Sequence, residues 1–84
     1  MTLPELMESF TQTLRDLLGD DTVVLASATT RQDVPTWDSF NYINFMVAIE
    51  MQFGIKFRVA EVESFRTVGE IAERTLALIQ ARQP

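Results

Sequence analysis

Apolar residues recur at helical spacing in three separate segments of this chain, and no other feature limits its fold as strongly. In residues 3–18 they stand three, four or seven positions apart, which places them on one face of an α-helix. Thr2 and Glu5 have the spacing of a capping box at its start, and Gly19 is a typical stop at its end. We therefore expect a helix over residues 3–18 whose buried face comprises Leu3, Leu6, Met7, Phe10, Leu14, Leu17 and Leu18.

Two further helices are predicted over residues 39–53 and 67–81. The first begins after Asp38, a residue type that suits a helix start, and ends before a glycine. The second opens with another capping-box pair, Thr67 and Glu70. Their expected buried faces comprise Tyr42, Phe45, Met46, Ile49 and Phe53 in the first helix, and Val68, Ile71, Ala72, Thr75, Leu78 and Ile79 in the second.

The segments between these helices predict a long loop and a short helix. Residues 19–38 show no sustained period and hold several turn-forming residues, so we expect a loop there. A short helix fits residues 59–64. The prediction is one all-α domain over residues 1–84, an irregular four-helix bundle with three main helices and one short helix. The residues expected to anchor the loop across the bundle are Val23, Val24, Leu25 and Val34.

Two residue types that carry much of protein chemistry do not occur in the sequence. Without cysteine the chain has no disulfide, thiolate nucleophile or cysteine metal site, and without histidine it lacks the commonest general base and metal ligand. A Ser-His or Cys-His nucleophile is therefore impossible, and no spacing of carboxylates singles out an acid-base pair. We expect no catalysis by the chain itself and no metal site.

The acidic charge also limits the partners of the protein. The formal net charge is −5, and the first 50 residues hold eight of the 12 acids but two of the seven basic residues. A negative surface repels nucleic acid and favours basic patches on partner proteins. The first ten residues do not resemble an export signal, and no stretch approaches the roughly 20 apolar residues of a membrane helix. We expect a cytoplasmic monomer that does not insert into membranes.

Ser39 is the candidate functional residue, because it lies at the predicted start of a helix. The unpaired backbone N–H groups and the dipole at that point favour an anion by about 0.3–1 kcal/mol. A phosphodiester on this hydroxyl would therefore sit in a suitable field. From this local pattern alone, a plain helix-start residue at Asp38 or Ser39 is the better explanation, because serine starts many helices.

A resemblance favours the functional interpretation. The segment Trp37-Asp38-Ser39-Phe40 and the apolar residues after it resemble the phosphopantetheine-binding carrier family of acyl carrier proteins, whose attachment motif is Asp-Ser-Leu. Thr67-Val68-Gly69-Glu70-Ile71 resembles the start of the last helix in that family. The likeness covers nearly the whole chain in order, length and helix spacing.

The resemblance implies a function for Ser39 and Asp38. Ser39 would receive 4′-phosphopantetheine from coenzyme A through a separate phosphopantetheinyl transferase (holo-acyl-carrier-protein synthase), and Asp38 would help that transferase to bind. The thiol of the arm would hold an acyl group as a thioester and present it to acyl-loading and acyl-transfer enzymes. The flexible arm would raise the effective concentration of the acyl group at each active site.

A second apolar stripe follows the other side of residues 39–53. It comprises Phe40, Ile43, Val47 and Met51, and one helix in so small a bundle cannot bury two faces. Carrier proteins of fatty acid synthesis present several acids on this helix, whereas here Asn41 and Asn44 occupy such positions and Glu50 is retained. We expect a partner-docking surface of Phe40, Ile43, Val47, Met51 and Glu50, recognised more through its apolar groups than through charge.

Two further interpretations concern the cargo and the rival functions. The many aromatic residues of the expected core would leave little room for a long acyl chain, so we expect a short or polar cargo in a specialised lipid or secondary-metabolite pathway. An aminoacyl or D-alanyl cargo remains an alternative. So does an unmodified helical interaction module, because the arm is invisible in the sequence.

Overall fold

The computed structural model describes residues 1–82 and contains only helices and connecting segments over that range. The predicted all-α, irregular four-helix bundle is confirmed. A 3-10 helix that the sequence does not predict lies within the long loop. The elements are α1 (Leu3–Leu18), η1 (Arg31–Asp33), α2 (Ser39–Phe53), α3 (Val59–Ser64) and α4 (Val68–Arg82).

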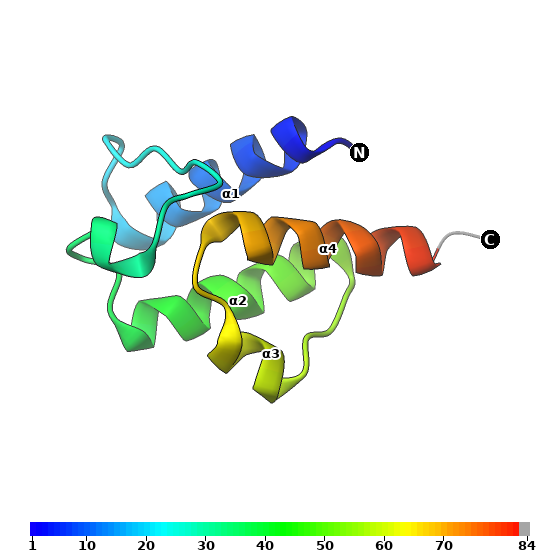
Figure 1. Cartoon of the computed structure of the whole chain (residues 1–84). Coiled ribbons are helices and arrows are strands. Elements are labelled where there is room, and N and C mark those ends of the chain that lie inside the picture. The colour runs from blue at the N-terminus through cyan, green and yellow to red at the C-terminus, as the bar shows by residue number, and fades with distance from the viewer. Residues whose placement is uncertain (83–84) are drawn as a thin grey trace.

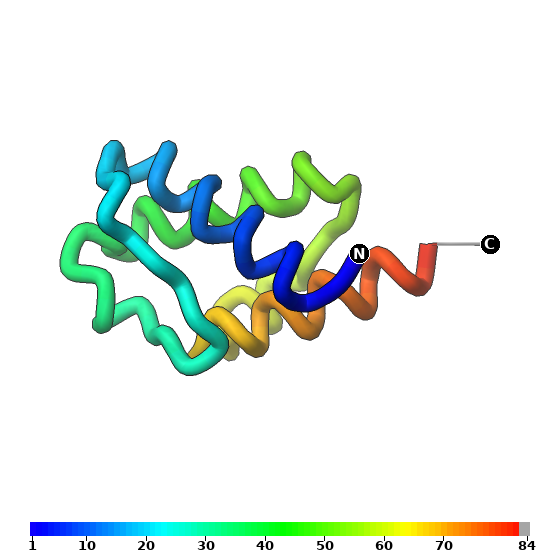
Figure 2. Tube along the Cα trace, turned by 90° about the horizontal axis from the view of Figure 1, so that it is seen from above, coloured from blue at the N-terminus to red at the C-terminus, as the bar shows by residue number. Residues whose placement is uncertain are grey.

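The three long helices lie beside one another, and α1 runs opposite to α2 and α4 (Figure 1). The short α3 lies within the connection between α2 and α4. Both views place the N-terminus and the end of α4 at one end of the molecule, opposite the long loop (Figure 2). The starts of α2 and α4 therefore share the end of the bundle that the loop covers.

Capping residues mark both ends of α1. The amide of Thr2 donates to the carboxylate of Glu5 at 2.9 Å, and the amide of Glu5 donates back to the hydroxyl of Thr2 at 3.4 Å. Gly19 ends the helix with a φ of 64°, a left-handed conformation that glycine adopts without a steric penalty. The predicted apolar face is buried only in part, because Leu3 and Leu17 remain 39% and 38% exposed near the two ends. The fully buried residues of α1 are Leu6, Phe10 and Leu14.

Helix α4 begins one residue later than predicted, with half of the expected capping box. The hydroxyl of Thr67 accepts from the amide of Glu70 at 3.2 Å, as the spacing predicts. The carboxylate of Glu70 accepts instead from the amide of Arg66 at 2.6 Å, one residue further back. The start of α4 is thus capped from two consecutive positions.

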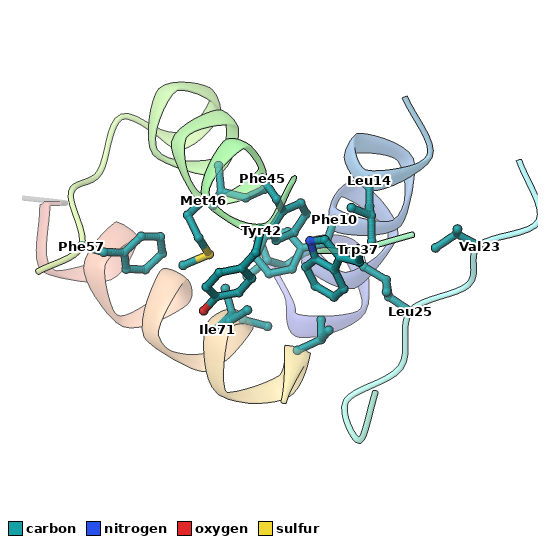
Figure 3. Packing of buried hydrophobic residues seen from close by; sticks show 14 of the residues in the cluster. Phe10, Leu14, Val23, Leu25, Trp37, Tyr42, Phe45, Met46, Phe57 and Ile71 are labelled. Atoms are coloured by element: carbon teal, nitrogen blue, oxygen red, sulfur yellow. The ribbon is translucent and has the colours of Figure 1, made fainter. Parts of the chain in front are cut away.

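The core is a chain of aromatic rings between the long helices (Figure 3). The rings of Phe10 on α1 and Phe45 on α2 are 5.5 Å apart, edge to face. Trp37, from the end of the long loop, places its ring 5.3 Å from Phe45. Edge-to-face aromatic pairs contribute about 0.5–1.5 kcal/mol beyond the area that they bury. The aromatic residues therefore join the loop to the helices.

The long loop is anchored by alternate residues, so one of its predicted anchors is wrong. Val23 and Leu25 are buried, and Val34 packs against the core, but Val24 is 71% exposed. The reason is that neighbouring side chains of an extended segment point to opposite sides.

Backbone contacts tie the same loop to the start of α4. The amides of Val68 and Gly69 donate to the carbonyls of Thr29 and Ser27, both at 2.9 Å. A Cβ at Gly69 would lie 2.8 Å from the carbonyl oxygen of Ser27, closer than real Cβ contacts allow. Only glycine permits this approach, so Gly69 sets how closely the loop covers the bundle.

The segment after α2 is held by carboxylates. The amide of Phe57 donates to Glu50 at 2.7 Å, which joins this segment to the last turns of α2. Glu61 on α3 pairs with Arg74 on α4. A hydrogen bond from the backbone amide of Arg58 to Glu61 lowers the pKa of that carboxyl, and Arg74 lowers it further.

No helix within residues 1–82 is both long and apolar enough to cross a membrane.

Candidate functional site

Ser39 is the first residue of α2, and it is exposed. Asp38 precedes it in an extended conformation and accepts the amide of Asn41 at 2.8 Å through its side chain. The carbonyl of Asp38 accepts the amide of Tyr42 at 2.8 Å, which starts the helical hydrogen bonding. Asp38 is therefore the helix cap. Ser39 presents its hydroxyl at the positive end of a 15-residue helix.

A cavity of about 640 Å³ lies beside Ser39. It is lined by residues 29–32 of the loop, the first turn of α2, part of α3 and the start of α4. Its apolar lining includes Ile43 and Val62, and its polar lining includes Thr30 and Thr67. The cavity opens to solvent, so a group attached to Ser39 has a recess of mixed polarity directly next to it.

An ordered pair of side chains, Arg31 and Tyr42, forms one wall of this cavity. The phenol of Tyr42 donates to the carbonyl of Val62 at 2.7 Å, which fixes the ring between α2 and α3. The guanidinium carbon of Arg31 lies 5.0 Å from the centre of that ring, in the range of a cation–π contact. Burial raises the pKa of the Tyr42 phenol, an effect that the charge of Arg31 partly offsets. The phenol stays protonated near neutral pH and keeps its bond to Val62.

Trp37 also lines the cavity, although it is only 3% exposed. Within residues 1–82 its indole nitrogen is the one buried side-chain nitrogen or oxygen without a hydrogen-bond partner. The ring packs between those of Tyr42 and Phe45, with ring centres 5.9 Å and 5.3 Å away, respectively. Because Trp37 lies two residues before Ser39, its packing fixes the path of the backbone into α2.

The second stripe of α2 is exposed along its whole length. The exposed fractions are 74% for Phe40, 51% for Ile43, 45% for Val47 and 80% for Met51. Single exposed apolar residues are ordinary, but a row of four on one helix is typical of an interaction surface. Glu50, which the sequence grouped with this stripe, is half-buried and bonded to the amide of Phe57.

The structure brings together some of the predicted site residues and adds others. Asp38 and Ser39 lie side by side at the start of α2, and Ile43 is shared between the exposed stripe and the cavity. Sequence reasoning did not identify Arg31, Arg66 or Val62 as cavity residues. Their contacts join distant segments, and no local spacing in the sequence signals them.

Comparison with known proteins agrees with this site. Residues 37–75 match a family model described as a phosphopantetheine attachment site. These residues include Asp38, Ser39, most of the cavity lining and the start of α4. No curated protein matches the chain in sequence.

Two solved structures share the fold. A holo acyl carrier protein from Geobacter metallireducens is 27% identical, with a TM-score of 0.84 over 92% of this chain and 88% of that chain. An acyl carrier protein from Thermotoga maritima is 16% identical, with a TM-score of 0.86 over 96% of this chain and 94% of that chain. The second likeness shows the fold alone. The family match over residues 37–75, together with the likeness to the holo acyl carrier protein, supports a phosphopantetheine-binding carrier domain of the acyl carrier protein type.

Proposed function

We propose that Ser39 carries 4′-phosphopantetheine through a phosphodiester on its hydroxyl, and that the protein presents acyl groups on this arm to partner enzymes. The observation that carries the proposal is the exposed hydroxyl of Ser39 at the first position of α2, inside the segment that matches the attachment family. The terminal thiol of the arm supplies the nucleophile that a cysteine-free chain lacks, and it holds the acyl group as a thioester.

The surroundings of Ser39 fit such a group. A phosphodiester there lies at the N-terminal end of α2, where the helix dipole and the unpaired amides stabilise negative charge. The cavity beside Ser39 offers room for the arm or for its acyl group without any change in the core. The hydroxyl is also accessible to a modifying enzyme. Because that enzyme supplies the general base, the chain needs none of its own.

Asp38 has two roles in this proposal. As the cap of α2 it fixes the backbone that presents Ser39. As an exposed carboxylate beside the reacting hydroxyl, it is the acidic contact for the phosphopantetheinyl transferase. In this proposal the chain itself does no chemistry on the acyl group. Loading and transfer belong to separate enzymes.

Intact mass tests the attachment directly. After incubation with coenzyme A, magnesium and a phosphopantetheinyl transferase, the protein should gain the mass of one phosphopantetheine. Ser39→Ala should gain none and keep its helical circular-dichroism signal. Ser64→Ala removes another exposed serine, on α3, and should still be modified. A protein that folds but stays unmodified would contradict the proposal and favour an unmodified helical interaction module.

We further propose that the exposed row Phe40, Ile43, Val47 and Met51 docks the acyl-loading and acyl-transfer enzymes. Its exposure and its position directly after Ser39 support this assignment. The scarcity of acids on the same helix favours a dedicated partner in a specialised lipid or secondary-metabolite pathway over a general fatty acid synthase. Glu50 belongs to this proposed surface only through the part of its carboxylate that Phe57 leaves accessible.

An aminoacyl cargo, including D-alanine, is the second candidate. The aromatic side chains that fill the core keep it open, because they favour a short or polar cargo. Incubation of the modified protein with acyl ligases and with amino-acid-activating ligases separates the two cargo classes. The mass of the loaded protein identifies the group that is transferred.

A further inference from the structure

The cavity beside Ser39 carries positive charge, although the net charge of the protein is −5. Arg31 and Arg66 both line it, and Glu63 is the one acid among its described lining residues. Ser39 and Val68, the first residues of two 15-residue helices, line it as well. The dipoles of α2 and α4 therefore add to the positive potential of the two arginines.

Arg31 is held in a position suited to binding an anion. Its guanidinium carbon lies over the Tyr42 ring, 5.0 Å from the ring centre, and the bond from Tyr42 to Val62 holds that ring in place. The cation–π contact uses none of the N–H donors of the guanidinium, so they remain available for an oxyanion. The single ion pair within residues 1–82 joins Arg74 and Glu61, so no carboxylate of that range forms an ion pair with Arg31. The side chain is also half-buried, which reduces the screening of its charge by water.

We infer that the Arg31 wall of this cavity binds an oxyanion carried on the arm of Ser39. The inference rests on the proposed attachment, because only an arm at Ser39 brings such a group into the cavity. Two parts of the arm have this chemistry: the phosphodiester next to Ser39, and a carboxylate at the free end of a dicarboxylic acyl group. Both present oxygen atoms that accept two parallel N–H bonds from one guanidinium.

The test compares four forms of the wild-type protein. They are the unmodified protein, the protein with the free-thiol arm, and the protein with a butyryl or a succinyl arm. The acyl groups are joined through an amide so that they cannot hydrolyse. Butyryl and succinyl match in carbon number and differ in charge. Intact mass confirms attachment in each form, and the Nε–H resonance of Arg31 in nitrogen–proton spectra is the readout.

The pattern of shifts identifies the source of the anion. A shift of the Arg31 resonance in all three modified forms supports the inference with the phosphodiester as the ligand. A shift confined to the succinyl form supports it with the carboxylate as the ligand. An Arg31 resonance that is the same in all four forms, while the amides of Asp38 and Phe40 report attachment, would overturn it. Failure of attachment itself appears in the mass and counts against the proposed function instead.

Variants supply an independent readout. In Arg31→Gln, the phosphorus resonance of the arm should move if the phosphodiester is the ligand. If the carboxylate is the ligand, the amide chemical shifts of Thr67 and Val68 should differ between the succinyl and butyryl forms of the wild type. In Arg31→Gln this difference should disappear. Lys56→Gln removes an exposed positive charge outside the cavity and should leave both measurements as in the wild type. If the two variants have equal effects, the shifts report the loss of any positive charge on the protein, and a site at Arg31 is rejected.

Discussion

At the scale of single residues, two carboxylates near opposite ends of α2, Asp38 and Glu50, have different roles. Asp38 caps the helix and stays exposed, so it is available to a modifying enzyme. Glu50 is half-buried, and its carboxylate holds the amide of Phe57 at the start of the segment that leads to α3. The hydrogen bond to Phe57 therefore occupies the carboxylate that a docking partner of Glu50 would have to contact.

Substitution of Glu50 separates these two roles. Glu50→Ala leaves the amide of Phe57 without its acceptor, and we expect a loss of about 1–3 kcal/mol in the free energy of unfolding. Urea denaturation followed through the fluorescence of Trp37, the single tryptophan, measures it. Glu73→Ala removes an exposed acid on α4 and should stay within about 0.5 kcal/mol of the wild type. Unchanged stability together with slower acyl transfer would assign Glu50 to docking alone.

At the scale of the element, α2 is the central helix and has two apolar faces. One face packs against α1 and the core through Tyr42, Phe45, Met46 and Ile49. The opposite face leaves four apolar side chains exposed. The N-terminus of the same helix presents Ser39, so the proposed attachment site and the proposed docking surface lie on one rigid element. A partner that binds the exposed face would thereby be placed next to the proposed arm.

A charge on the exposed face of α2 should interfere with partners and leave folding intact. Val47→Asp places a carboxylate at the middle of the row, at a side chain that is 45% exposed. We expect an unchanged circular-dichroism spectrum and an acyl-transfer rate lowered about tenfold or more, because a charge buried at an interface centre costs at least 1.4 kcal/mol or so. Val24→Asp, at an exposed position on the loop, serves as the control. Transfer by the physiological partner at the wild-type rate would refute docking through this face.

At the scale of the whole molecule, the interior and the site are separate. The centre of the bundle is filled by side chains with no exposed surface, among them Phe10, Leu14 and Phe45. The space next to Ser39 lies instead at the end of the bundle, between the loop, α2, α3 and the start of α4. Close packing makes the interior resistant to insertion, whereas the end cavity is already open.

A long saturated acyl group should therefore stay near the cavity. When it is attached through an amide to the arm, we expect chemical-shift changes at Ile43, Val62 and Val68, relative to the free-thiol form. The side-chain chemical shifts of Phe10 and Leu14 should match those of the free-thiol form, because opening the packed core would break several contacts at once. Large shifts at Phe10 and Leu14 would show that the chain enters the bundle, and would overturn the expectation of a short or polar cargo.

Local spacing was sufficient to predict much of this molecule. Thr2 with Glu5, and the glycines at positions 19 and 54, mark the ends of α1 and α2, because capping depends on residues only a few positions apart. The same rules place Ser39 at a helix start, and the period of the apolar residues predicts a row of side chains on α2 that the core cannot cover. The fold class follows from such short-range patterns, whereas the resemblance of residues 37–40 and 67–71 to the carrier family singles out Ser39 as the candidate attachment residue.

Only the tertiary structure decided which residues meet across the chain. Val24 turns outward between two buried neighbours, Glu50 reaches Phe57, and the guanidinium of Arg31 lies over the ring of Tyr42. Each of these depends on how separate segments pack: the direction of an extended loop, the path of a connector, or the fit of the loop against α2. Periodicity records which face of an element is apolar, but it holds no information about the partner that covers that face. The charged cavity beside Ser39 is therefore a property of the packed molecule, while the position of Ser39 is a property of the sequence.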